Sequence, residues 1–356
     1  MGVYLLYVAS PVLVYLLLGK FLSLRFDEIK VRKILLVACG IIMALMIGLR
    51  NPHVGSTDTY VYMQNWNVVQ RIPLDGLWDY LTHMDMEGGY LIFAWIFSHI
   101  FEDPQWLLVI SGVFFSWSVC TFVHRNCKNI ILPLLLFNCL GLFNFMVQGL
   151  RQAIAMCICL WAIEFVKKRK LFKFLFMVAL ACSFHASAIV FVIVYFLYKL
   201  KLNTPSLFYF SAFLSALVFW LPELFELTNT VINDTYEMGK GAESGGVVAI
   251  LIYAVIIIFG IAFREKNNEF FPMFVYMTIV GMVAMIMRNS VSTIVERISF
   301  YFSFAQMVLI SNGISTIKDR RSNILVNLTV TLLLIGVAFH KASYSTLVPY
   351  LFFWQS

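Results

Sequence analysis

The sequence predicts an all-α polytopic membrane protein with about twelve transmembrane helices. Of its 356 residues, 61% are hydrophobic and 13% are charged, and the mean hydropathy is +0.85, as in proteins embedded in lipid. Many apolar stretches approach the roughly 20 residues that cross hydrocarbon, and basic clusters recur at every second gap between them. This pattern leaves no room for a separate soluble domain, so we expect residues 1–356 to form a single integral membrane domain.

The basic clusters orient the chain, because loops rich in lysine and arginine stay in the cytoplasm. Six clusters hold 19 of the 26 lysine and arginine residues. They lie between Lys20 and Lys33, at Arg125 and Lys128, between Lys167 and Lys173, at Lys199 and Lys201, at Arg264 and Lys266, and between Lys318 and Arg321. Thirteen of the nineteen acidic residues fall in the opposite loops. The net charge of +7 is therefore a topology signal, and no nucleic-acid partner is expected.

The positions of the charged residues predict the first two transmembrane helices and the first outer loop. The first apolar stretch lacks a small-residue cleavage site after a short apolar core, so we expect an uncleaved transmembrane helix with an external N-terminus. A second crossing leads to an outer loop from Arg50 to about Asp103. Within that loop, Gly88 to Phe101 is apolar but has no basic residue at either end. It cannot cross without inverting every later helix, which predicts a re-entrant or interfacial helix.

The later crossings alternate between the remaining clusters and leave a second outer loop at about 222–246. Its asparagine and glycine residues are typical of a mobile lid. Seven cysteines lie in or beside apolar stretches and form no CxxC pair. Cys157 and Cys159 point to different faces of a helix, which argues against a shared metal. We expect packing cysteines, no metal and no cofactor.

Helix rise places several polar residues below the outer surface. Arg151 precedes Lys167 by sixteen residues, a rise of about 24 Å, and His185 follows Lys170 by fifteen, about 22 Å. Arg50 reaches a similar level above Lys33. Hydrocarbon is roughly 30 Å thick, so such residues need a wet cavity or a polar partner. We therefore predict an outward-facing cavity with His185 at its base, lined by Arg50, Arg151, Arg288 and Arg297, with Asp58 and Glu296 nearby.

Guanidinium groups stay charged and form paired hydrogen bonds with phosphate oxygens, so such a cavity suits a lipid diphosphate. Other interpretations are open. Arg288 and Arg297 are also placed as interfacial arginines would be, with Glu296 as an ion-pair partner. Asp58 also suits the start of a helix. Tyr90 and other aromatic residues of the first outer loop fit either sugar stacking or an interfacial belt.

Two motifs carry a family resemblance. The stretch Gly48-Leu-Arg50-Asn-Pro-His-Val-Gly55-Ser-Thr-Asp58-Thr-Tyr-Val-Tyr62 resembles the signature after the second helix of EpsG-type exopolysaccharide polymerases, which are similar to the Wzy O-antigen and capsule polymerases. The second is Gly149-Leu-Arg151-Gln152-Ala-Ile-Ala, followed by a basic cluster and Phe184-His185-Ala-Ser187. The sequence departs from the family pattern at one place: residues 55–58 read Gly-Ser-Thr-Asp, where the family usually has Gly-Thr-Asp.

The resemblance implies a bacterial cytoplasmic (inner) membrane enzyme of the metal-independent glycosyltransferase C type, with its active site facing the periplasm or exterior. Such an enzyme joins undecaprenyl-diphosphate-linked oligosaccharide repeat units, with arginines stabilising the lipid diphosphate leaving group. Expected partners are that lipid-linked oligosaccharide as donor and acceptor, membrane lipid, a chain-length regulator and a flippase. The expected catalytic residues are His185, Arg151, Asp58 and Arg288. The expected substrate-binding residues are Arg50, Gln152, Arg297, Glu296 and Tyr62.

Two other functions remain open. A flippase or transporter of lipid-linked oligosaccharides should carry its charges around the membrane midplane and show two related halves. Here the polar signals cluster toward one surface, and no duplication is evident. An O-antigen ligase-type transferase shares the expected architecture, and only the family signature separates it from a polymerase. The segment Asp85-Met-Glu87 mimics a metal-binding DxD motif, but its external location predicts a solvated loop.

Overall fold

Helices account for the described structure, as expected for apolar segments that must satisfy their own backbone hydrogen bonds. The computed structural model describes all residues except 56, 233–244, 289–292, 344 and 356. Among the described residues, the sole β pairing is an isolated bridge between Arg50 and Phe352. The elements in chain order are α1 (Gly2–Val14), η1 (Tyr15–Gly19), α2 (Lys20–Ser23), α3 (Glu28–Gly48), α4 (Thr57–Val69), η2 (Leu74–Gly76), α5 (Leu77–His83), α6 (Gly88–Ser98), α7 (Gln105–Asn126), α8 (Ile131–Cys139), α9 (Leu142–Gln148), α10 (Leu150–Lys167), α11 (Leu171–Cys182), η3 (Ala186–Ile193), α12 (Val194–Leu197), α13 (Thr204–Ile232), α14 (Gly245–Ala262), α15 (Phe271–Met287), α16 (Thr293–Ser315) and α17 (Arg320–Ala342).

Several helices are long and apolar enough to cross a membrane. Within the described residues there are five such segments, or six if the bent pair α8 and α9 forms one span, with 55° between its helices. The five are Gly2–Ser23, Glu28–Gly48, Gln105–Asn126, Val295–Ser315 and Arg320–Ala342. The all-α, multi-pass class is thus confirmed over the described residues. The total of about twelve crossings stays a prediction, because several apolar helices have only 10–17 residues.

The chain divides into two compact units, Met1–Ile189 with Ile324–Ser356, and Val190–Asn323. In the first unit, α7 packs against α3 and α10, and α10 also packs against α11. The α3–α7 contact is close, because a Cβ added at Gly112 would lie 2.9 Å from the carbonyl oxygen of Ala44. Most side chains of α10 are buried. This helix is therefore a rigid support for residues at its ends.

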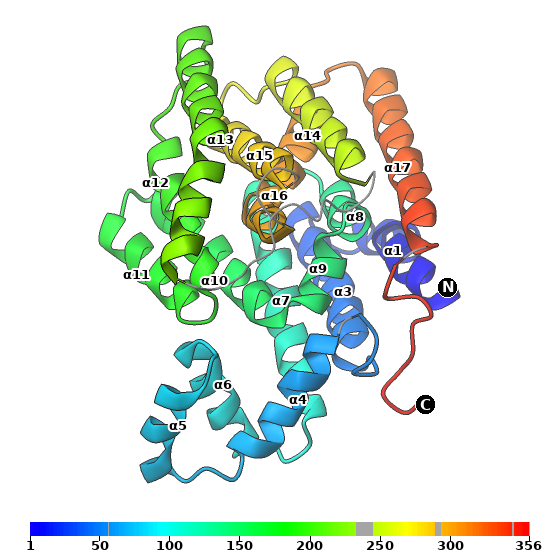
Figure 1. Ribbon diagram of the computed structural model, residues 1–356. Coiled ribbons are helices and arrows are strands. Elements are labelled where there is room, and N and C mark those ends of the chain that lie inside the picture. The colour runs from blue at the N-terminus through cyan, green and yellow to red at the C-terminus, as the bar shows by residue number, and fades with distance from the viewer. Residues whose placement is uncertain (56, 233–244, 289–292, 344, 356) are drawn as a thin grey trace. The chain divides into compact units, whose positions relative to one another are not determined.

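The first outer loop is largely helical. It contains α4, η2, α5 and α6, which lie together in Figure 1, and α4 packs against α6. α6 has eleven residues, which span about 16 Å, roughly half of the hydrocarbon thickness. The helix is therefore too short to cross by itself. The second outer loop begins later than the sequence predicts, because α13 continues to Ile232, and residues 233–244 lie outside the described residues.

The residues after α17 return to the end of α3. The amide of Asn51 donates to the carbonyl of Leu351 at 2.8 Å, and that of Phe353 donates to the carbonyl of Leu49 at 2.9 Å. The Tyr350 hydroxyl donates to the carbonyl of Met46 at 2.6 Å. These bonds hold the C-terminal segment beside the start of the loop that contains Arg50.

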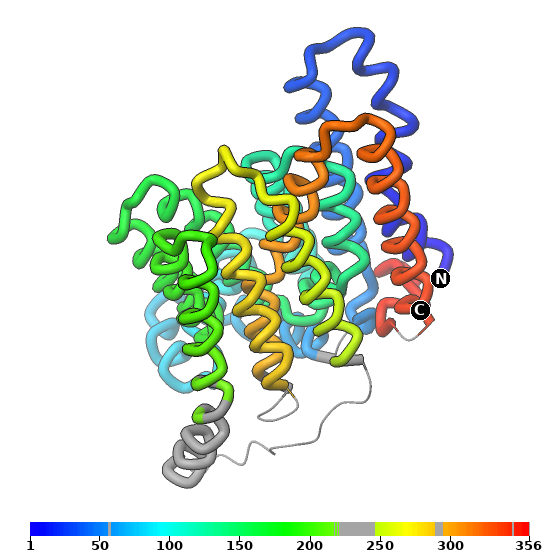
Figure 2. The backbone as a smooth tube through the Cα atoms, turned by 90° about the horizontal axis from the view of Figure 1, so that it is seen from above, coloured from blue at the N-terminus to red at the C-terminus, as the bar shows by residue number. Residues whose placement is uncertain are grey.

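In the second unit, α14, α15 and α16 run side by side (Figure 2). Gly281 of α15 lies against Tyr253 of α14, since an added Cβ would be 3.0 Å from the tyrosine ring. The Tyr253 hydroxyl shares a 2.5 Å hydrogen bond with that of Ser303 on α16. One buried polar pair thus connects two of these helices.

Candidate functional site

A break between two helices places Arg151. α9 ends at Gln148, and α10 begins at Leu150. Gly149 occupies the junction and caps both helices. Arg151 therefore lies in the first turn of α10, and Lys167 is the last residue of the same helix. The predicted rise of about 24 Å between them runs along one continuous helix.

Arg151 has two partners from the first outer loop. Its Nε donates to the Tyr62 hydroxyl at 3.1 Å, and its guanidinium carbon lies 5.5 Å from the centre of that ring. Its Nη1 forms an ion pair with the Glu87 carboxylate. The Arg151 side chain is 22% exposed and that of Glu87 is 23% exposed. The Arg151 guanidinium therefore stays accessible enough to bind an anionic ligand.

Glu87 connects Arg151 to the segment that contains His185. It is the residue before α6, and its second carboxylate oxygen accepts a hydrogen bond from the amide of Ala186 at 3.2 Å. Ala186 is the first residue of η3 and directly follows His185. The prediction that the Asp85–Glu87 segment is merely a solvated loop is wrong for Glu87, since its carboxylate joins two segments that each carry a predicted catalytic residue.

His185 lies in the turn between α11 and η3 and is half-buried. Its Nδ1 is 2.7 Å from the Ser187 hydroxyl oxygen, a contact that orients the ring. Which of the two atoms donates depends on the histidine tautomer. The turn therefore presents an oriented imidazole next to the residue whose amide binds Glu87.

The start of α6 docks against this turn through a glycine. The amide of Gly89 donates to the carbonyl of Ser183 at 2.7 Å. A Cβ at Gly89 would lie 2.3 Å from the Ser183 hydroxyl oxygen and 2.6 Å from its carbonyl oxygen, distances that no side chain tolerates. At Gly88, by contrast, nothing lies within 4 Å of an added Cβ. Close approach of the two backbones thus requires glycine at position 89 and not at position 88.

Tyr90 of α6 packs against Tyr62, the tyrosine that contacts Arg151. Its side chain is fully buried, and its ring centre lies 5.3 Å from that of Tyr62. Its hydroxyl has no hydrogen-bond partner among the described residues. Leaving such a group unpaired costs about 1–3 kcal/mol. Both Tyr90 and Trp66 are fully buried, so neither belongs to an exposed aromatic belt.

Arg50 is buried, with 1% of its surface exposed. It donates to the carbonyl of Val54 at 2.6 Å, to the hydroxyl of Thr59 at 3.0 Å and to the carbonyl of Val147 at 2.9 Å. Burial lowers the pKa of Arg50 to about 10, so the group stays charged at neutral pH. Its donors connect the loop before α4 to the end of α9, a geometry that favours a positioning role.

The other predicted residues of the first unit differ in accessibility. Asp58 lies in the first turn of α4 and is exposed, where a carboxylate interacts favourably with the helix dipole. Gln152 is 2% exposed within α10. Of these two, Asp58 alone is open to a ligand in the described structure.

Residues 33–352 match the model of the EpsG family. The chain belongs to the EpsG family. No curated protein and no solved structure matches it. Membership in the EpsG family indicates a polysaccharide-polymerase type of enzyme, and together with the apolar helices it indicates a multi-pass membrane protein.

The remaining site residues of this EpsG-family chain lie in the second unit. The Nε of Arg288, at the end of α15, is 3.0 Å from the Glu296 carboxylate, as the sequence allows for an ion pair. The Arg288 side chain is 13% exposed and that of Glu296 is 25% exposed. Arg297 is exposed. Within this unit, Arg288 and Glu296 thus form an ion pair, and Arg297 follows Glu296 in the first turns of α16.

Proposed function

We propose that this EpsG-family protein polymerises polysaccharide from undecaprenyl-diphosphate-linked repeat units at the outer face of the bacterial cytoplasmic membrane. The supporting observation is the cluster of Arg151, Glu87, Tyr62 and the His185 turn, which combines a partly exposed cation with an oriented imidazole. Family membership supports the polymerase class. The external location rests on the positions of the basic clusters in the sequence.

Arg151 receives the lipid diphosphate in this proposal. When the glycosyl bond breaks, negative charge develops on the departing diphosphate, and a fixed guanidinium stabilises that charge without reorganising. Glu87 is the resident counter-ion of Arg151, and the diphosphate oxygens take its place. Tyr62 keeps Nε of Arg151 in position during this exchange, because its hydroxyl accepts from that nitrogen. Glu87 is thus a positioning residue that sequence analysis does not identify.

His185 activates the acceptor in the proposed reaction. The hydroxyl oxygen at the non-reducing end of one repeat unit attacks the anomeric carbon of the growing chain, forming a new glycosidic bond. The bond from that carbon to the diphosphate oxygen breaks, and the lipid diphosphate leaves. The hydroxyl proton passes to Nε2 of His185, which requires the tautomer whose Nδ1–H donates to Ser187. Asp58 is the alternative base, since it is exposed on α4.

The roles of the other residues follow from their contacts. Arg50 holds the loop before α4, the helix whose first turn contains Asp58. Gln152 is buried within α10 and follows Arg151 in the sequence. For Arg288 we retain the predicted catalytic role at the leaving diphosphate. For Glu296 and Arg297 we retain the predicted roles in substrate binding. The reaction is proposed to need no metal, and the lipid-linked oligosaccharide is both donor and acceptor. A chain-length regulator and a flippase are proposed partners.

The test is reconstitution of the purified protein in liposomes with its lipid-linked repeat unit, followed by gel separation of the products. We expect a ladder that survives a chelator. Arg151→Ala should abolish the ladder, whereas Arg71→Ala should not, because Arg71 is an exposed arginine of the same outer loop. A ladder lost on chelation would refute metal independence. Translocation of the lipid-linked unit without any ladder would favour a flippase.

A further inference from the structure

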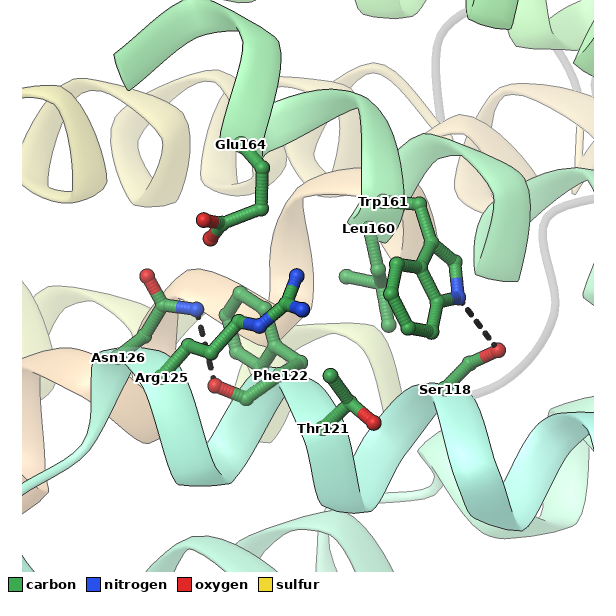
Figure 3. Close-up of a pocket in the computed structure, with 8 residues that line it drawn as sticks. All are labelled: Ser118, Thr121, Phe122, Arg125, Asn126, Leu160, Trp161 and Glu164. Carbon is green, nitrogen blue, oxygen red and sulfur yellow. Dashed lines mark hydrogen bonds between the residues drawn. The ribbon is translucent and has the colours of Figure 1, made fainter. Parts of the chain in front are cut away.

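A hollow lies between α7 and α10, at the end of α7 that carries the second basic cluster (Figure 3). Its lining residues are Ser118, Thr121, Phe122, Arg125, Asn126, Leu160, Trp161 and Glu164. The Trp161 indole nitrogen donates to the Ser118 hydroxyl at 3.0 Å, which fixes the ring as one wall. The hollow lies within the first unit, at the opposite end of α10 from Arg151.

The charges at and beside the hollow sum to a positive excess, because Arg125 and Lys167 outnumber Glu164. Glu164, its acidic residue, is already paired with Lys167 at 3.4 Å, and Lys167 also donates to Asn126. The Arg125 guanidinium lies over the Trp161 ring, 5.0 Å from its centre. No carboxylate pairs with Arg125 among the described residues. A guanidinium stacked in this way keeps its N–H donors for an anion.

Further cations surround this end of α7. Arg32 donates to the carbonyls of Cys127 at 2.6 Å and Lys128 at 2.7 Å. Arg32, Lys33 and Arg125 all lie within electrostatic reach of His124. The local field therefore favours an anion at the mouth of the hollow.

An apolar stripe leads away from Arg125 along α7. Residues spaced four apart lie on one face of a helix, and this face carries Val113, Trp117, Thr121 and Arg125. Val113 is 55% exposed and Trp117 is 59% exposed, and the Trp117 ring lies 4.7 Å from that of Trp161. The distance from Arg125 to Val113 is about 18 Å, close to the thickness of one leaflet of a roughly 30 Å hydrocarbon layer.

We infer that this hollow and stripe bind one anionic glycerophospholipid. Its phosphate contacts Arg125 at the mouth of the hollow, and an acyl chain lies along Trp117 and Val113. The excess of cations selects an anionic headgroup over a zwitterionic one. The exposed apolar face selects a lipid over a free phosphate compound. This site is independent of the proposed polymerase chemistry.

The experiment compares phosphatidylglycerol with phosphatidylcholine of identical acyl chains, titrated onto the full-length protein in detergent and followed by native mass spectrometry. We expect phosphatidylglycerol to bind at least roughly 5-fold more tightly, as one cation near a membrane surface contributes. Excess glycerol phosphate should not displace it. Arg125→Ala should remove that preference, while Lys173→Ala, at an exposed lysine of α11, should retain it.

Trp117→Ala should weaken binding of both lipids to a similar extent, because it removes the acyl contact and leaves the charge. The unfolding midpoint of each variant checks that it is folded, and Arg125→Lys, which keeps the charge, should restore most of the preference. Equal affinity for the two lipids would overturn the inference. Unchanged selectivity in folded Arg125→Ala, or displacement by glycerol phosphate, would overturn it as well.

Discussion

Replacing Arg50 tests whether this arginine positions a loop or contacts substrate. In Arg50→Met, three buried oxygens lose their donor, those of Val54, Thr59 and Val147. Hydrogen bonds to a charged group contribute about 1.5–3 kcal/mol each. Burial of the cation, which lowers its pKa to about 10, offsets part of that gain. We expect a net loss of about 3 kcal/mol in the free energy of unfolding.

The assay is thermal unfolding in detergent with a thiol-reactive dye. Cys157 and Cys159 are free and buried, so they react only after unfolding. The midpoint should fall by on the order of 5 °C in Arg50→Met. Thr59→Val, which removes one of the three bonds, should lower it less. Polymer yield should fall in parallel and recover at lower temperature. An unchanged midpoint with complete loss of polymer would instead assign Arg50 to substrate binding, as the sequence motif predicts.

Three further predictions concern α6 and the start of α3. Gly89→Ala should abolish polymerisation in liposomes, because its Cβ would overlap the turn before His185. Gly88→Ala should keep wild-type activity, because its Cβ meets nothing within 4 Å. Equal activity of the two variants would contradict the docking of α6 against that turn. Tyr90→Phe should raise the unfolding midpoint slightly or leave it unchanged, since it removes a buried hydroxyl without a partner; a clear decrease would show that the hydroxyl is satisfied. Asp27 is the N-cap residue of α3, and its carboxylate accepts from the amide of Lys30 at 2.9 Å, which holds the pKa of that carboxyl below its usual value. This cap should stabilise the protein at pH values above the normal aspartate pKa and weaken as the pH falls through the lowered pKa. Asp27→Asn should remove this acid dependence of the unfolding midpoint.

Local patterns predict the class of the fold and several site residues. Apolar length and basic clusters identify an all-α membrane protein, because these signals act within one helix and its flanks. The sixteen-residue spacing from Arg151 to Lys167 gives the correct helical rise because α10 is unbroken between them. The turn at His185 departs from continuous helix, since α11 ends at Cys182 and η3 follows.

Contacts between residues far apart in the chain are harder to predict from a single sequence. Glu87 and Arg151 are 64 positions apart, and nothing in the local pattern links them. The adjacent Gly88-Gly89 pair is a signal that could have identified this segment, because consecutive glycines often mark close backbone approach. Similarly, the burial of Arg50 depends on the end of α9 and could not be read from its own motif.

The return of the C-terminal segment to the end of α3 makes the final residues a convenient attachment point for an orientation probe. Asn51 and Leu351 are held together by a backbone hydrogen bond, so a fluorescent protein or alkaline phosphatase joined downstream of Gln355 would occupy the same aqueous compartment as the Arg50 loop. Fluorescence develops on the cytosolic side and phosphatase activity on the exported side. A single pair of fusions would therefore assign the sidedness of that loop without altering any of its residues.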